Sequence, residues 1–134
     1  LLSRCKSFAY GSSLIARRQA VVAGADDALL LSSNGDLCCG TSANLLVHGD
    51  EGWLTPPLTS GCLPGVMRQR ALERGLIREA AISPAALKAA GQAWLINSLG
   101  CRPISPLNAT PNNSSATDSI RRGAEAFWRG LLSA

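Results

Sequence analysis

The pattern of hydrophobic and polar positions predicts two β-hairpins in the first half of the chain. Apolar residues at 28–31 indicate a buried strand, and the Asn34-Gly35 pair that follows is typical of a tight turn. The chain is then expected to return along residues 36–39. A second hairpin is expected from strands at 44–48 and 53–55, which flank a glycine-containing turn.

Helical periodicity and end signals predict three helices in the first two thirds of the chain. Residues 12–23 have apolar positions at a seven-residue spacing, and residues 66–74 are bounded by glycine. Ser83 followed by Pro84 is a strong N-cap and first-turn signal for a third helix, which should end near Gly91.

The end of the chain is predicted to be a polar loop, residues 105–117, followed by an amphipathic helix that starts at Thr117 or Asp118. Arginines should face the solvent from this helix. The residues expected to face inward are Ile120, Ala124, Phe127 and Leu131. Further short strands are expected at 1–5, 76–81 and 94–96. Since hairpins and helices do not alternate regularly, the expected fold class is α+β.

Composition indicates one folded domain with a hydrophobic core. The chain has 134 residues, of which 46% are hydrophobic and 16% charged. No apolar run approaches the roughly 18 residues of a membrane helix, so no membrane partner is expected. The net charge of +4 comes from scattered residues, and aromatics make up only 4% of the chain. Nucleic-acid binding is therefore not expected, and the basic balance suits an anionic small ligand.

The five cysteines lack the paired spacings of a zinc site, and their odd number is a poor disulfide framework. We therefore expect reduced thiols, a cytoplasmic location and no bound metal. Met67 is the only methionine, and no apolar stretch follows the basic residues near Leu1. These features suggest a fragment of a longer protein without a secretion signal.

Four segments could carry chemistry, although each taken alone is better explained by an ordinary surface or turn. Lys6 is one of only two lysines in an arginine-rich chain, and its amine can deprotonate where a guanidinium cannot. Residues 38–44 and 97–100 are turns rich in small and polar side chains. In residues 63–68 a glycine leads into a helix, so the free N–H groups of its first residues could bind a phosphate.

The order of these segments is specific. Lys6-Ser7-Phe8-Ala9-Tyr10, the Leu63-Pro64-Gly65-Val66-Met67-Arg68 run and Asn97-Ser98-Leu99 occur in sequence with the acidic pair at 26–27 and the Thr-Pro-Pro loop at 55–57. Over residues 3–104, this arrangement resembles the C-terminal domain of class IV pyridoxal-phosphate aminotransferases. The resemblance implies the large domain of the D-amino-acid aminotransferase-like fold, a mixed sheet with barrel-like strands and flanking helices.

The resemblance also implies a role for each matching residue with the cofactor pyridoxal 5'-phosphate. Lys6 would form the Schiff base and then carry protons, and Tyr10 would hydrogen-bond the phenolic oxygen of the cofactor. The phosphate would receive the backbone N–H groups of Val66 and Met67. Asn97 and Ser98 would add further donors.

One position departs from the family pattern. The glutamate that normally contacts the pyridine nitrogen falls on Cys39. A neutral thiol, with a reference pKa of about 8.5, stabilises a protonated ring poorly, so the cofactor would be a weaker electron sink. We expect this to cost a transaminase more than a lyase, in which aromatisation of the product drives the reaction forward. A rival hypothesis is that Cys39 marks a non-catalytic homologue.

Two details favour a lyase within the family. Met67 stands where transaminases usually carry threonine, and Asn97-Ser98-Leu99 is similar to the pattern of 4-amino-4-deoxychorismate lyases. The leading expectation is therefore cleavage of 4-amino-4-deoxychorismate to 4-aminobenzoate and pyruvate, on the folate route. A branched-chain or D-amino-acid transaminase is the alternative. The resemblance further implies a homodimer, and an N-terminal domain outside these 134 residues that completes the site for the small-molecule substrate.

Overall fold

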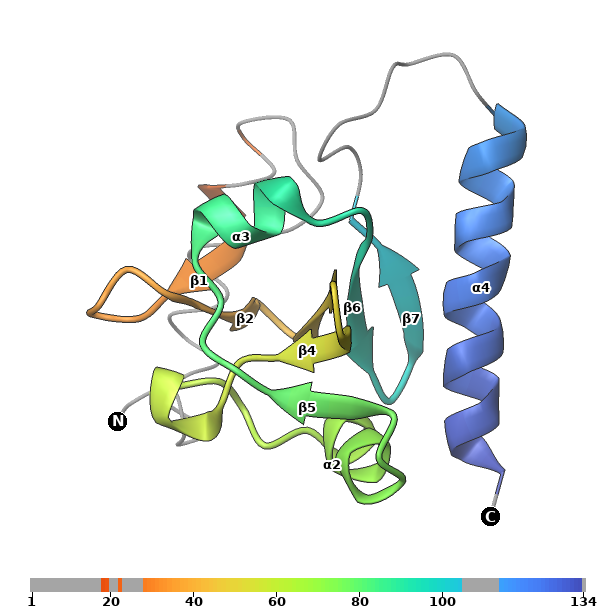
Figure 1. Ribbon diagram of the computed structural model, residues 1–134, viewed down its shortest axis with the longest axis horizontal. Helices are drawn as coiled ribbons and strands as arrows, with labels where there is room; N and C mark the ends of the chain where they lie inside the picture. Colours follow the sequence, from red (N-terminus) through yellow and green to blue (C-terminus); the bar gives the residue numbers. More distant parts are fainter. Residues whose placement is uncertain (1–17, 20–21, 23–27, 105–113, 134) are drawn as a thin grey trace.

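The computed structural model describes residues 18–19, 22, 28–104 and 114–133 (Figure 1). Its centre is a seven-stranded sheet in which β3 pairs with three other strands, β2, β4 and β6. All pairs are antiparallel except β4 with β5. The strands are β1 (Leu29–Leu31), β2 (Leu37–Gly40), β3 (Asn44–Gly49), β4 (Gly52–Thr55), β5 (Ile77–Glu79), β6 (Ala93–Asn97) and β7 (Gly100–Pro103).

Both predicted hairpins are confirmed. Gly35 and Gly52 adopt positive φ angles of 83° and 118° in their turns, a conformation that favours glycine. The expected burial of the first strand is wrong, because Leu31 is 56% exposed. Among the described strands, β1 stands at the end of the sheet order and pairs with β2 alone, and the register shifts between Leu30 and Leu31.

The helices after residue 65 match the expected positions closely. They are α2 (Val66–Glu73), α3 (Pro84–Ala89) and α4 (Ser114–Leu132), with a 3-10 turn, η2, at Leu58–Ser60. The Ser83 hydroxyl accepts a hydrogen bond from the Ala86 N–H at 3.1 Å, which is the N-cap expected from the sequence.

One helix boundary and one strand differ from the sequence-based expectation. The last helix begins at Ser114, not at Thr117 or Asp118, because polar residues in a first helical turn cost little. Strand β7 was not predicted at all, since its four residues hydrogen-bond only to β6. The predicted strand at 1–5 and most of the helix predicted at 12–23 lie outside the described residues. Within that helix, Val22 is helical and 85% exposed.

The sheet separates two hydrophobic cores, because successive side chains of β3 point to opposite faces. On one face Leu46 joins Met67 of α2 and Ala124 and Leu131 of α4. On the other face Leu45 packs with Leu87 of α3 and its neighbours. The inward positions expected for the last helix are thus confirmed at its two fully buried residues.

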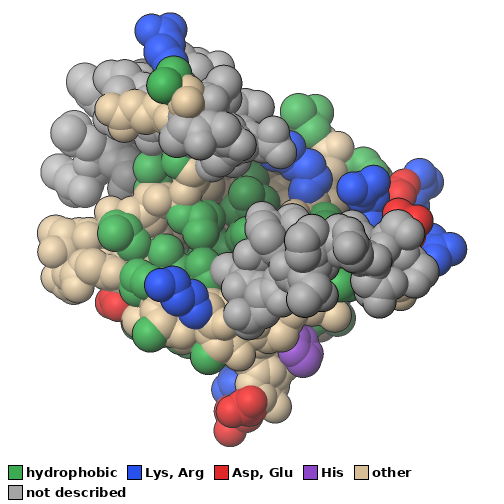
Figure 2. Space-filling view, turned by 90° about the horizontal axis from the view of Figure 1, so that it is seen from above, with side chains coloured by type: hydrophobic (Ala, Val, Ile, Leu, Met, Phe, Trp, Pro, Cys, Tyr) green, Lys and Arg blue, Asp and Glu red, His purple; other side chains and the backbone are tan. Residues whose placement is uncertain are grey.

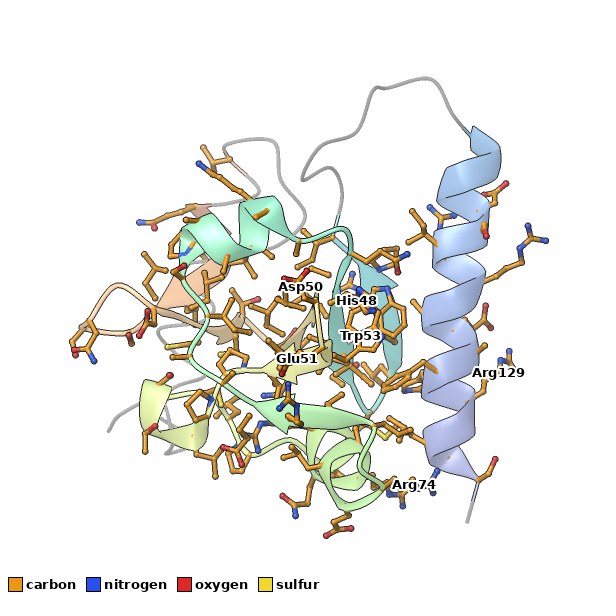
Figure 3. The ribbon with its side chains drawn as sticks, viewed as in Figure 1. His48, Asp50, Glu51, Trp53, Arg74 and Arg129 are labelled. Carbon is orange, nitrogen blue, oxygen red and sulfur yellow. The ribbon has the colours of Figure 1, made fainter. Side chains whose placement is uncertain are left out.

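Arg70 of α2 and Arg74, its C-cap residue, bind the C-terminal end of α4, which runs alongside β7 (Figure 1). Arg70 donates to the carbonyl of Leu131 at 3.0 Å. Arg74 donates to the carbonyls of Gly130 and Ser133 (Figure 3). Carbonyls of a last helical turn lack intrahelical partners and carry partial negative charge. These bonds therefore fix α4 against α2.

His48 lies at the molecular surface, beside the turn of the β3–β4 hairpin (Figure 2). Its ring packs edge-on against the Trp53 ring, with 5.0 Å between the ring centroids (Figure 3). Trp53 in turn stacks on the buried Trp94, with 3.8 Å between the centroids. Within the described ranges, no helix is both long and apolar enough to cross a membrane.

Candidate functional site

Five of the seven residues expected to bind the cofactor belong to the described part of the chain. Cys39 is buried in β2, Val66 and Met67 open α2, and Asn97 and Ser98 stand at the end of β6. The two others, Lys6 and Tyr10, lie outside the described residues, and their roles stay predictions.

Asn44 links the first two of these segments. Its backbone pairs with Cys39 across the β2–β3 turn. Its side-chain Nδ2 donates to the carbonyl of Leu63 at 2.8 Å, and its Oδ1 lies against Gly65. Asn44 therefore contacts both segments: its backbone pairs with Cys39, and its side chain contacts the loop that leads into α2.

Asn97 links the third segment to the same turn. Its Nδ2 donates to the carbonyl of Ser42 at 3.1 Å. Its Oδ1 accepts from the N–H groups of Leu99 at 2.8 Å and Gly100 at 3.2 Å, which closes the β6–β7 turn. The structure thus brings together the three described segments that the sequence singled out. It also shows that the Asn97 amide already bonds within the protein.

The start of α2 is suited to an anion. Gly65 is the N-cap, and no described side chain caps the free N–H groups there. Val66 is 61% exposed, whereas the Met67 side chain is 3% exposed and packs into the core. Any contact that Met67 makes with a ligand would therefore be through its backbone. Free N–H groups and the helix dipole together favour a phosphate at this end.

Arg68 fixes the loop that precedes this helix. Its side chain is 1% exposed. The guanidinium donates to the carbonyl of Pro56 at 3.2 Å and pairs with the Glu79 carboxylate at 3.3 Å. A buried cation with these two partners holds the Pro56 loop, α2 and β5 in one arrangement.

Cys39 lies in a cluster of buried thiols with Cys38 and Cys62, all of them less than 6% exposed. Burial, reinforced by the neighbouring Cys62, raises the pKa of Cys38. The Cys38 thiol donates to the carbonyl of Ser60. None of the four cysteines of the described ranges forms a disulfide, and no group of three metal-binding side chains is found in those ranges.

The described residues therefore suit one part of the cofactor, the phosphate, better than another, the ring nitrogen. The uncapped start of α2 fits its phosphate. The buried thiol cluster does not reproduce the acidic partner that would hold a proton on the ring nitrogen. Sequence reasoning did not assign roles to Asn44 and Ser42, which connect the segments. Asn44 is the last residue of the small, polar segment 38–44 that the sequence singled out, so a signal for it was present.

A cavity of about 460 Å³ adjoins the turn that Asn97 closes. Its walls come from Ser42, Asn97 and Leu99 on one side, and from Arg121 and Trp128 of α4 on the other. The Trp128 ring is held there by a hydrogen bond from Nε1 to the carbonyl of Asn97 at 3.0 Å. Cys39 and the start of α2 do not line this cavity, so it lies beside the candidate site.

Comparisons with known proteins agree with this arrangement. The chain is 38% identical over 63 residues to the Schizosaccharomyces pombe protein named "Putative aminodeoxychorismate lyase", a match covering 47% of this chain and 27% of that protein. A solved structure named as a "Putative 4-amino-4-deoxychorismate lyase" from Legionella pneumophila is 28% identical, with a TM-score of 0.67. That match covers 83% of this chain and 44% of the other.

The branched-chain amino acid aminotransferase of Escherichia coli is also similar. It is 27% identical with a TM-score of 0.68, over 83% of this chain and 41% of the enzyme. The chain thus spans less than half the length of these relatives. Residues 1–107 match the family model described as amino-transferase class IV, a family of pyridoxal-phosphate enzymes. The chain therefore belongs to the class IV aminotransferase family.

Proposed function

We propose that this chain is the cofactor-binding C-terminal part of a lyase that converts 4-amino-4-deoxychorismate to 4-aminobenzoate and pyruvate. The observation that supports this most is the convergence of Cys39, the start of α2 and the Asn97 turn, which Asn44 and Asn97 hold together by hydrogen bonds. Two of the similar proteins carry the name of this lyase.

Pyridoxal 5'-phosphate, when bound, supplies an electron sink for the carbon that bears the substrate amine. In this proposal Lys6 would hold the cofactor through its amine and carry protons, and Tyr10 would hydrogen-bond the phenolic oxygen of the cofactor. The backbone N–H groups of Val66 and Met67 bind the phosphate. Asn97 and Ser98 place further donors beside it.

The thiol of Cys39 favours the lyase over the transaminase. A buried neutral thiol cannot stabilise a proton on the ring nitrogen as a carboxylate does, so charge withdrawal is weaker. Loss of pyruvate from this substrate produces an aromatic ring, and the stability of that product compensates for a weaker sink. Transfer of an amino group has no such compensation.

The complete enzyme needs more than these 134 residues. Since the chain spans less than half of its solved relatives, we propose that an N-terminal domain supplies the rest of the phosphate and substrate contacts. A cytoplasmic homodimer that works in folate synthesis is the assembly proposed for the whole protein.

The test compares two products made by the intact protein. We expect pyruvate to be released from 4-amino-4-deoxychorismate, with little amino-group transfer to a 2-oxo acid. Borohydride reduction followed by peptide mass analysis should find the cofactor on Lys6. Transfer to a branched-chain oxo acid faster than pyruvate release would instead support the alternative, a branched-chain or D-amino-acid transaminase. That alternative is favoured by the similarity to the Escherichia coli enzyme.

A protein that forms no Lys6 adduct at all would be the non-catalytic homologue. In that case Cys39 would mark a lost activity, and the fold alone would be shared with the family.

A further inference from the structure

Asn44 is a buried polar residue beside the candidate site, held by its backbone and by its side chain. Its side chain is 4% exposed, and its backbone pairs with Cys39 of β2 and with Ile96 of β6. A residue hydrogen-bonded into a sheet on both sides cannot shift without moving the neighbouring strands. Its side-chain amide is therefore held in a fixed position and can fix the position of the groups that it contacts.

That amide contacts the segment that leads into α2. Nδ2 donates to the carbonyl of Leu63 at 2.8 Å, and the same carbonyl accepts from the Gly65 N–H at 2.9 Å. The Gly65 carbonyl in turn accepts from the Gln69 N–H at 3.0 Å, which is the first turn of the helix. A continuous chain of hydrogen bonds thus runs from β3 to the helix start.

The contact with Gly65 is close as well as polar. A Cβ at residue 65 would overlap Oδ1 of Asn44, so only glycine allows the loop to lie this near to the amide. Two neighbouring contacts, one hydrogen-bonded and one steric, fix both the distance and the direction of the loop. Val66 and Met67 come directly after Gly65, so the orientation of this loop sets the orientation of their N–H groups.

We infer that Asn44 is a positioning residue for the cofactor phosphate, and this rests on the proposed function. It stands between the position of Cys39, at the ring-nitrogen end of the cofactor, and the N–H groups at the phosphate end. Its amide sets the spacing between them. Loss of the amide lets the helix start move away from the phosphate, while attachment of the aldehyde to Lys6 is unaffected.

The experiment separates phosphate binding from overall binding. The intact protein is titrated with pyridoxal 5'-phosphate and, separately, with pyridoxal, which lacks the phosphate, and each Kd is measured from the absorbance of the Lys6 adduct. In Asn44→Ala we expect the Kd for the phosphorylated form to rise about tenfold, the loss expected for one well-placed hydrogen-bonded arrangement. The Kd for pyridoxal should change less than about twofold, since the aldehyde contacts do not depend on Asn44.

Thr55→Val is the matched control. Thr55 is fully buried and donates from Oγ1 to the carbonyl of Leu45 at 2.8 Å, a similar side-chain-to-backbone bond that does not touch the helix start. This variant should lower the melting temperature as Asn44→Ala does and leave the ratio of the two Kd values unchanged.

The outcomes are distinct. A wild type that forms an adduct, with an unchanged Kd ratio in Asn44→Ala, would overturn the positioning role alone. A wild type that forms no adduct with either compound would overturn the proposed function itself. If Asn44→Ala does not fold, Asn44→Ser provides the same comparison, because its hydroxyl keeps a polar group at this position but is one atom shorter than the amide that bonds Leu63. A Kd ratio equal to that of the wild type would again overturn the inference.

Discussion

The guanidinium of Arg74 donates to the carbonyl of Gly130 at 2.6 Å, and this bond joins residues that are 56 positions apart in the chain. It closes the C-terminal end of α4 with a cation, where the helix dipole is negative. Together with the bond from Arg70 to Leu131, it holds the C-terminal end of α4 against α2.

We expect Arg74→Ala to lower the free energy of unfolding by about 1 kcal/mol, because it removes charge-assisted bonds to helix-end carbonyls at an exposed position. Urea denaturation measures the change. The matched control is Arg78→Ala, which removes an exposed pair with Glu51 whose side chains are 60% and 80% exposed. Such pairs contribute about 0–1 kcal/mol. Equal losses in both variants would show that Arg74 does not anchor the helix.

Arg68→Ala should lower the free energy of unfolding far more than Arg74→Ala does. The guanidinium is 1% exposed and holds Pro56 and Glu79, so its removal leaves a buried carbonyl without this donor and a void in the core. A loss of about 3 kcal/mol is expected for breaking a buried network. Glu79→Gln, whose side chain is 45% exposed, keeps the shape and should cost less. A stability of Arg68→Ala close to that of the wild type would contradict the bracing role.

The stability of the fold should fall at high pH because of Cys101. Burial raises the pKa of its thiol to about 12. Since the unfolded thiol loses its proton near its ordinary value of about 8.5, the folded state binds more protons between these two values. The contribution is complete at neutral pH and is lost progressively as the pH rises towards 12.

The check is the difference between wild type and Cys101→Ala in the free energy of unfolding, measured at pH 8 and pH 10.5. We expect this difference to shrink at the higher pH. A difference that is the same at both values would mean that the buried thiol does not titrate differently in the two states.

Cys39→Glu should raise amino-group transfer relative to pyruvate release. A carboxylate at this position would hold a proton on the ring nitrogen and strengthen the electron sink. The ratio of the two products, measured with the same preparation, reports the change. Cys39→Ser, which is similar in size and neutral, is the control and should leave the ratio unchanged. If Cys39→Glu also leaves it unchanged, the thiol does not account for the preference.

Local signals allowed much of the fold to be predicted. The Asn34-Gly35 turn, the Ser83 cap and the glycine before α2 each act within a few residues, so the pattern alone located the hairpins and two helices. The start of α4 at Ser114 and the short strand β7 escaped prediction. The polar residues at the start of α4 are compatible with either a helix or a loop, so the sequence did not locate that start. Strand β7 forms by pairing with β6, which its own residues do not reveal.

The residues of the candidate site could be predicted from the sequence, but the contacts between them could not. Cys39, Val66, Met67, Asn97 and Ser98 were identified from the order of motifs, but nothing in their spacing shows that they meet. Asn44 and Ser42 bring them together through hydrogen bonds to Leu63 and Asn97, which lie 19 and 55 residues away. Contacts of that separation depend on how β3 pairs with its neighbours.

The amino-acid sequence by itself determined the local elements, the family and the chemical types present, including the thiol where an acid is usual. Only the tertiary structure decided that Leu31 at the end of β1 is exposed, that both faces of β3 are buried, and that one asparagine lies between the two ends of the candidate site. Turns and caps involve neighbours in the chain and can be recognised from it. Burial and long-range hydrogen bonds arise only when distant segments pack together, which no single stretch of residues encodes.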